Sequence, residues 1–250
     1  MIAKEVVDPA MIRAKESVDD EEAMPLLAYA IKHDLGDSFL MTIVEKGADL
    51  DVTVGSGETA QTIVGLAIMR QWDEKFIKRM IAAGAPLPRL IDGVALVEFL
   101  YRRKQFNLMK VVIAYGSPTD IQIEGKTLLG KMILDHPEFV HYYILGHVFV
   151  DVGGVQCDVL SKFDLNAKGA MRQNVLHEYF ESQHCEDGVF LKLIELGADP
   201  DHPNANQKTP LQILLDRGRA VGKEVKRPAL RVLQREIGKA KDVYKRSQKK

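Results

Sequence analysis

The sequence is poor in the residues that define several kinds of scaffold. Its 250 residues include two cysteines, Cys157 and Cys185, and one tryptophan, Trp72. Two cysteines are too few for the disulfide framework of a secreted domain, so we expect a reducing compartment. No apolar run approaches the roughly 18 residues of a membrane helix, and the amino terminus lacks the apolar core of a signal peptide. These absences predict a soluble, cytoplasmic protein.

Short motifs of common chemistries are also missing. The sequence has no glycine-rich phosphate loop, no paired catalytic carboxylates and no His-Glu metal motif. We therefore expect no cofactor, no metal, no small-molecule substrate and no enzyme activity. One catalytic alternative is the Cys157 thiol beside His177 or His184, because a thiolate nucleophile needs an adjacent base. A zinc site of His177, His184 and Cys185 is the metal alternative, although no fourth ligand is evident.

Charged residues are numerous but unevenly distributed. The formal net charge is −1, yet residues 223–250 hold 11 Lys or Arg against 3 acidic residues, a balance of +8. Residues 1–222 therefore carry a balance of −9, which indicates a basic tail on an acidic body. The tail either binds nucleic acid or an anionic membrane or forms a solvated helix face. Residues 245–250 are predicted to be disordered.

A phrase of an apolar pair followed by a glycine turn recurs along the chain. Its clearest copies are Ile-Val-Glu-Lys-Gly-Ala-Asp-Leu at 43–50 and Leu-Ile-Glu-Leu-Gly-Ala-Asp-Pro at 193–200. Looser copies stand at 80–87, 112–119 and 143–150, the last with His147 in the place of the glycine. The turn positions are 47, 84, 116, 147 and 197, which gives steps of 37, 32, 31 and 50 residues. Such a period predicts repeated helix pairs.

The repeat resembles the ankyrin repeat over residues 23–220, with a period near 33 residues. The closest matches are the Gly-Ala-Asp turns and Thr-Pro-Leu at 209–211, whereas the middle copies are degenerate. Asn-Val-Leu-His at 174–177 is similar to the family's Thr-Pro-Leu-His. The resemblance implies an all-α solenoid of about five to six stacked helix-turn-helix units, in which His177 is a structural histidine that hydrogen-bonds turn backbone. It also implies a concave surface of loops and first helices that holds a protein partner.

We predict three segments: a capping helix in residues 1–22, the repeat array in 23–220, and a basic capping helix with a tail in 221–250. Helical spacing of apolar residues predicts helices that include 94–104, 106–115, 174–183 and 187–196. Alternating apolar and polar residues at 50–57 and 119–125 predict short extended segments, either repeat hairpins or partner contacts. An apolar stripe near the end predicts packing on the last repeat. Its residues are Leu230, Leu233, Ile237, Ala240 and Tyr244.

The step of 50 residues indicates an enlarged inter-repeat loop. About 17 residues remain beyond one repeat, and we place this insert at 150–171. An irregular excursion from a regular array is either a binding device or tolerated variation. Its apolar residues either fold it onto the body or meet a partner.

Partner-binding candidates are aromatic, apolar or charged residues in loops or at helix ends. They are Trp72, Tyr101, Arg102, Arg103, Phe149, Val155, Phe163, Asp201 and His202. Trp72 and Tyr101 end first helices, where each is either an exposed anchor or part of the packing. We predict a non-enzymatic protein-interaction module, such as an adaptor, a scaffold or a secreted effector-like protein, with a protein partner of unknown identity. The alternatives are an enzyme with Cys157 as nucleophile and a tether that acts through the basic tail.

Overall fold

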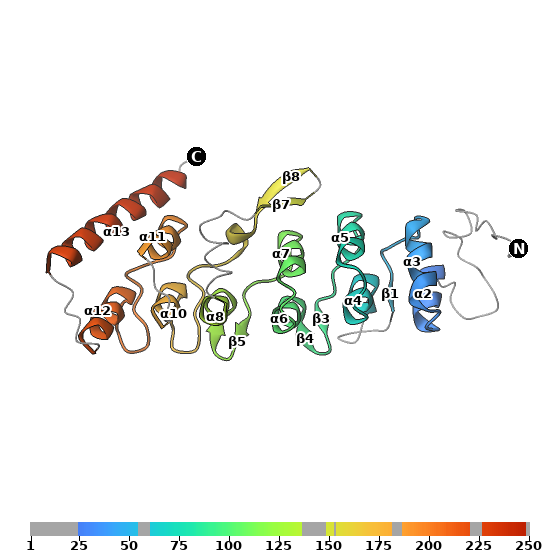
Figure 1. Ribbon diagram of the computed structural model, residues 1–250, viewed down its shortest axis with the longest axis horizontal. Coiled ribbons are helices and arrows are strands. Elements are labelled where there is room, and N and C mark those ends of the chain that lie inside the picture. The colour runs from blue at the N-terminus through green and yellow to red at the C-terminus, as the bar shows by residue number, and fades with distance from the viewer. Residues whose placement is uncertain are drawn as a thin grey trace, which may run out of the picture. The chain divides into compact units, whose positions relative to one another are not determined.

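The computed structural model describes residues 25–54, 61–136, 149–152, 154–181, 187–220 and 227–248. The chain divides into two compact units, Met1–Ser117 and Pro118–Lys250. Helices dominate the described part of both units and the strands are short (Figure 1), so the predicted all-α class is confirmed. The predicted capping helix at 1–22 lies outside the described residues.

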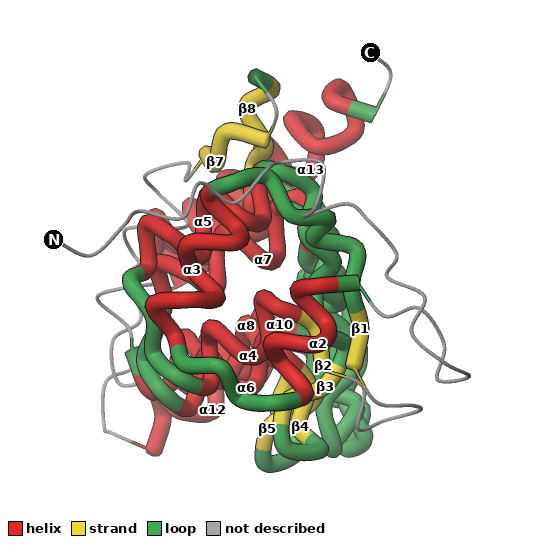
Figure 2. Tube along the Cα trace, turned by 90° about the vertical axis from the view of Figure 1, so that its right-hand side faces the viewer, coloured by secondary structure: helices red, strands yellow, loops and turns green. Residues whose placement is uncertain are grey.

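The described part of the first unit consists of helix pairs joined by short strands. Its helices are α2 (Leu26–Lys32), α3 (Asp37–Glu45), α4 (Ile63–Met69), α5 (Glu74–Ala82), α6 (Leu96–Arg102) and α7 (Phe106–Ala114). Its antiparallel hairpins are β1 (Thr53–Val54) with β2 (Gln61–Thr62), and β3 (Leu90–Ile91) with β4 (Val94–Ala95). Figure 2 shows α4 and α6 in one layer and α5 and α7 in another, so each of these pairs contributes one helix to each layer.

These helices bury the apolar stripes that the sequence predicts. In α2 the buried residues include Leu27, Ala30 and Ile31, which recur at helical spacing. The helix α5 begins after Asp73, whose carboxylate accepts a hydrogen bond from the Phe76 amide at 3.1 Å, as N-cap residues do. The predicted helices at 94–104 and 106–115 are confirmed as α6 and α7.

One turn geometry closes helices in both units. Its glycines are Gly47, Gly84, Gly116 and Gly197, with φ of 85°, 92°, 98° and 111°. A positive φ strains any residue that has a Cβ, so glycine is favoured after a helix end. The following amide donates back to the helix, as Ala85 N does to Met80 O at 3.0 Å. These turns lie where the sequence predicts them, and the remaining predicted position, 147, lies outside the described residues.

The second unit combines helices with two hairpins. It begins with β5 (Gln122–Ile123), β6 (Lys126–Thr127) and α8 (Leu128–Asp135). A longer hairpin of β7 (Phe149–Val152) and β8 (Val155–Asp158) leads into the 3-10 helix η2 (Val159–Lys162). The later helices are α10 (Val175–Glu181), α11 (Asp187–Glu195), α12 (Pro210–Ala220) and α13 (Arg227–Ser247). Because α10 contacts α8, α11 and α12, it forms the centre of this unit.

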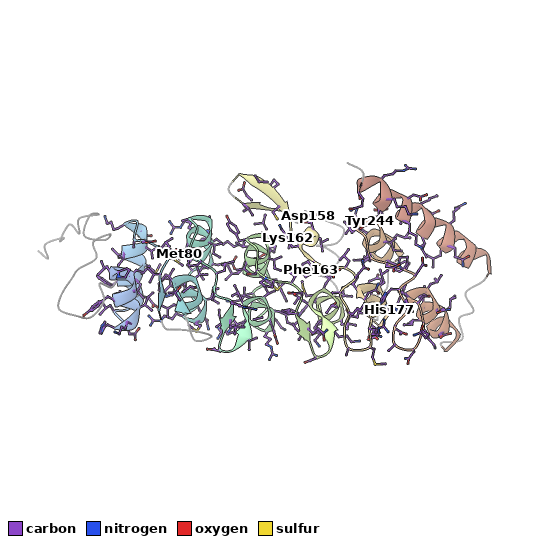
Figure 3. The ribbon with its side chains drawn as sticks, turned by 180° about the vertical axis from the view of Figure 1, so that it is seen from behind. Met80, Asp158, Lys162, Phe163, His177 and Tyr244 are labelled. Atoms are coloured by element: carbon purple, nitrogen blue, oxygen red, sulfur yellow. The ribbon has the colours of Figure 1, made fainter. Side chains whose placement is uncertain are left out.

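The last helix, α13, packs on α11 through the apolar stripe that the sequence predicts. Ile237 and Ala240 are buried, and the ring of Tyr244 lies against Gly197 (Figure 3). A Cβ on Gly197 would meet Cε2 of Tyr244 at 2.6 Å, so the glycine permits this close contact. The predicted disorder of 245–250 is wrong for 245–247, because α13 continues to Ser247. No described helix combines the length and apolar character needed to cross a membrane.

Candidate functional site

The insert predicted at 150–171 has two structurally different parts. The first is the β7–β8 hairpin, residues 149–158. The second, which we name the clamp (residues 159–172), contains η2 and an irregular segment. Val159, Leu160 and Leu165 of the clamp are 1%, 3% and 7% exposed, so their side chains belong to the core. The insert is therefore neither a wholly projecting loop nor wholly packed.

The clamp is attached to the segment that precedes α8. Three hydrogen bonds with 2.6–2.8 Å separations make this attachment. They run from Thr119 Oγ1 to Lys162 O, from Gln122 Nε2 to Lys168 O, and from Ala170 N to Gly125 O. All three acceptors are backbone carbonyls. Two of the donors are the side chains of Thr119 and Gln122, and the third is the backbone amide of Ala170, so the attachment depends on backbone positions as well as on side-chain identity.

Asn166 attaches the clamp to the turn that follows α11. Its Nδ2 donates to the Gly197 carbonyl at 2.9 Å, and its Oδ1 accepts the Asp199 amide at 2.7 Å. A single side chain thus joins the irregular segment to the repeated glycine turn. Further along, the Ala205 amide donates to the carbonyl of Met171 at 2.8 Å. The clamp is held on both sides, and Figure 3 shows Asp158, Lys162 and Phe163 in succession where it leaves the hairpin.

A pocket of about 140 Å³ lies where the clamp meets the β5–β6 segment. Its lining includes Thr119, Leu128, Phe163 and Lys168. Sites for small organic ligands usually measure about 300–1,000 Å³. This pocket is smaller than such sites, and we assign it to the packing around Phe163.

The β7–β8 hairpin presents two unlike faces. Val150 pairs with Cys157 and Val152 with Val155, and these four side chains share one face because cross-strand partners point the same way. The intervening pair, Asp151 and Gln156, is exposed on the other face. The carboxylate of Asp151 accepts the Gly154 amide at 2.8 Å and so fixes the turn. Val155 is 68% exposed beside this turn, whereas Val150, Val152 and Cys157 are half-buried.

A carboxyl group is completely buried where α10 packs on α8. Glu178 is 0% exposed, and its two oxygens accept hydrogen bonds from the backbone amide and the hydroxyl of Thr127, at 3.0 and 2.5 Å. Its seat depends on two glycines: a Cβ on Gly130 would lie 1.7 Å from Oε2, and one on Gly169 would lie 2.7 Å from Oε1. Burial raises the pKa of Glu178 to about 7, although the hydrogen bonds from Thr127 and the charge of Lys126 oppose this.

The predicted structural role of His177 is confirmed. The side chain is 0% exposed, its Nδ1 lies 2.6 Å from Asn174 Oδ1, and its Nε2 lies 3.1 Å from the Lys208 carbonyl oxygen. Burial lowers the pKa of the imidazole, so it is neutral at physiological pH. Both ring nitrogens are engaged, so His177 has no free nitrogen to act as a base for Cys157. The other zinc and base candidates, His184 and Cys185, lie outside the described residues.

Of the two roles that the sequence leaves open for Trp72 and Tyr101, the structure shows packing and not an exposed anchor. They are 8% and 6% exposed, respectively. The Trp72 ring packs edge-on against Phe76 with centroids 5.8 Å apart, and the Tyr101 ring packs against Phe106 at 6.3 Å. Each ring packs against the second helix of its own pair, Trp72 on α5 and Tyr101 on α7, so both rings contribute to packing.

The arginines after Tyr101 remain at the surface of the first unit. Arg102 forms an ion pair with Glu98 at 2.6 Å, and its side chain is 62% exposed. The Arg103 guanidinium lies 4.5 Å from the centre of the Phe99 ring, within the range of a cation–π contact. Both side chains therefore have local partners on α6, and each remains accessible to a binding partner.

The last two candidates occupy the turn before α12. The Asp201 side chain is 75% exposed and forms an ion pair with Lys241 of α13. The His202 ring lies 6.1 Å from that of His177, and within the described residues its buried Nε2 has no hydrogen-bond partner. Phe149 lies in β7, but its side chain is outside the described atoms. The candidates thus form no single cluster within either unit.

Sequence reasoning missed Glu178 and Asn166. A signal for Glu178 was available, because it follows His177 in a helix whose neighbouring residues are apolar. Asn166 offered no comparable signal, since its partners are backbone groups about 30 residues away. No protein-family model matches the chain, and no curated protein is significantly similar to it.

Proposed function

We propose that the chain is a non-enzymatic protein-binding module built from ankyrin-type repeats. The observation that carries this proposal is the recurrence of one turn geometry after α3, α5, α7 and α11, each with a positive-φ glycine and a returning amide hydrogen bond. Repeated units of one kind stack through shared apolar faces and leave their loops free to bind. Contacts of α5 with α7 in the first unit, and of α10 with α8 and α12 in the second, support such stacking.

The hairpins between the helix pairs provide the contacting surface in this proposal. Asp92 and Gly93 form the tip between β3 and β4, and both have positive φ, as tight hairpin turns require. Both tip residues are exposed, whereas Ile91 beside them is 3% exposed. The strands are thus anchored in the core while the tips remain available. Loops on a rigid scaffold are the usual location of binding residues.

The alternatives have less support. The pocket of about 140 Å³ beside Phe163 is smaller than the usual sites for small organic ligands, and the engaged nitrogens of His177 remove one base for Cys157. The basic tail has internal partners: Glu236 contacts both Arg235 and Lys239, and Lys241 contacts Asp201. These ion pairs reduce the charge that α13 offers to nucleic acid or a membrane.

A pair of crosslinking variants tests the proposal. A photo-crosslinking amino acid replaces Asp92 at a hairpin tip in one variant and Gln71 in the turn between α4 and α5 in the other. The two positions are matched, because both are exposed and both have positive φ, 52° and 57°. Illumination in cell lysate should give a discrete crosslinked protein from position 92 and none from position 71. Equal crosslinking from both positions, or none from either, would refute the proposed binding surface.

A further inference from the structure

The β7–β8 hairpin is a ribbon with no described strand on either outer edge. Val152 pairs with Val155, so the connecting loop has two residues. In such hairpins the pair beside the loop exchanges hydrogen bonds, and the next pair directs its backbone groups outward. The N–H and C=O groups of Phe149 and Asp151 therefore face away from β8, while those of Gln156 and Asp158 face the opposite side.

The two edges of the hairpin differ in whether their outward backbone groups already form hydrogen bonds. On the β8 side, the Asp158 carbonyl accepts the Ser161 hydroxyl at 2.6 Å, and the chain turns directly into η2. On the β7 side, the outward backbone groups of Phe149 and Asp151 have no hydrogen bond within the described residues. Among the residues that the structure describes, the β7 edge is therefore the one whose outward backbone groups are unpaired.

This edge lacks most of the features that usually prevent strand addition, and Asp151 is its one charged residue. Exposed edges are commonly protected by lysine, by proline, by a bulge or by short length. Residues 149–158 contain no Lys, Arg or Pro, and their pairing is regular over four residue pairs. The other described hairpins have strands of two residues each, so β7 offers a pairing surface that they do not.

Charge and side-chain alternation define the segment that would fit. The hairpin carries Asp151 and Asp158 without any cation of its own. A strand added beside β7 places alternate residues next to Asp151, where opposite charge is favourable and like charge is not. Its other residues continue the face formed by Val150 and Val152. A second copy paired through the same edge would bring acidic hairpins together, which disfavours that occupant.

We propose that the β7 edge binds an extended segment of a partner protein, in which apolar and basic residues alternate, as a third strand of the β7–β8 sheet. Main-chain hydrogen bonds give such a complex its affinity, and the alternating side chains give its specificity. The clamp supports this role because it fixes the base of the hairpin on both sides. The inference deepens the proposed binding function and names the partner's chemistry.

Two proline variants distinguish the edges. Asp151→Pro removes an outward N–H from β7, and Gln156→Pro removes the equivalent outward N–H from β8. The two residues are cross-strand partners in a pair without mutual hydrogen bonds, so neither change breaks the hairpin's own ladder. Asp151→Asn is a third variant, which removes the charge while keeping an acceptor for the Gly154 amide.

The probe is a library of short random peptides, displayed on phage and selected against the full-length protein. We expect enriched peptides in which apolar residues alternate with Lys or Arg. Binding should fall about tenfold or more in Asp151→Pro, fall less in Asp151→Asn, and stay within about twofold in Gln156→Pro. On binding, the amides of Phe149 and Asp151 should gain protection from hydrogen exchange.

Three results would overturn the inference. They are enriched peptides without alternation, equal loss in both proline variants, and retained affinity after N-methylation of the peptide amides that pair with β7. Dimerisation that Asp151→Pro abolishes would likewise replace the partner segment with a second copy. None of these outcomes affects crosslinking from position 92, so a failure of this inference is distinguishable from a failure of the proposed function.

Discussion

Glu178 should make the stability of the second unit depend on pH in an unusual direction. Burial raises its pKa from an ordinary 4.5 to about 7, so the folded protein holds this proton more tightly than the unfolded chain does. Stability from this group is therefore fully present below about pH 4.5 and is lost as the pH rises to about 7. Lys126 opposes the raised pKa and Glu181 reinforces it, and these are the charged groups that act on Glu178.

The size of the effect follows from the two pKa values. A difference of one pKa unit corresponds to 1.36 kcal/mol, so the complete loss is about 3 kcal/mol, and most of it falls between about pH 5 and pH 8. Glu178→Gln removes this titration and keeps the geometry of the protonated acid. Its amide oxygen can accept the Thr127 amide, and its nitrogen can donate to the Thr127 hydroxyl oxygen. Relative to wild type, the free energy of unfolding of the variant should rise by about 2–3 kcal/mol between these pH values.

Urea denaturation followed by circular dichroism at both pH values measures this difference. Carbon NMR of the Glu178 carboxyl group gives its pKa directly. Glu181→Gln is the matched control, because Glu181 lies one turn further along α10 but is exposed and paired with Lys126 at 2.5 Å. Its effect should stay within about 1 kcal/mol. Parallel stability curves for wild type and Glu178→Gln across this range would refute the reasoning.

Three further substitutions test the packing that positions the site. Gly130→Ala should cost about 3 kcal/mol or more by urea denaturation and clearly less in a Glu178→Ala background, because its Cβ would lie 1.7 Å from Glu178 Oε2; additive costs would contradict this contact. Asn166→Ala should cost about 1–3 kcal/mol and speed amide exchange in the turn after α11; unchanged exchange would refute its bridging role. Tyr244→Ala should lower the free energy of unfolding by about 2–3 kcal/mol, whereas Val243→Ala, at a side chain 46% exposed, should change it by no more than about 0.5 kcal/mol. Equal losses in the two variants would contradict the packing of Tyr244 against Gly197.

Features that depend on local periodicity could be predicted from the sequence. The glycine turns need only a residue that tolerates positive φ after an apolar pair, and both signals lie within a few positions of each other. His177 was also predictable, because its nearest partner is Asn174, three residues away in the same phrase. The apolar stripe of α13 could be identified for the same reason, since helical spacing alone places Ile237 and Ala240 on one face.

Features that depend on distant parts of the chain could not be predicted. Trp72 lies in the turn between α4 and α5, and its neighbours in the sequence do not reveal that its ring packs against Phe76. The apolar neighbours of Glu178 in α10 are a signal of burial, but they do not reveal its partners Thr127 and Gly130, which lie about 50 residues away in sequence. Burial of a charged group depends on which helices pack against each other, and composition carries little information about this packing.

The division of the insert bears on whether it is a binding device or tolerated variation. Ordering a loop costs about 1–2 kcal/mol of backbone entropy for each residue, so a neutral insertion is expected to remain a polar, mobile excursion. The clamp does the opposite, because it buries Val159, Leu160 and Leu165 and commits Asn166 to two backbone groups. This ordered base supports a hairpin in which Val155, beside the turn, is 68% exposed. An anchored base beneath an accessible hairpin favours presentation to a partner over tolerated variation.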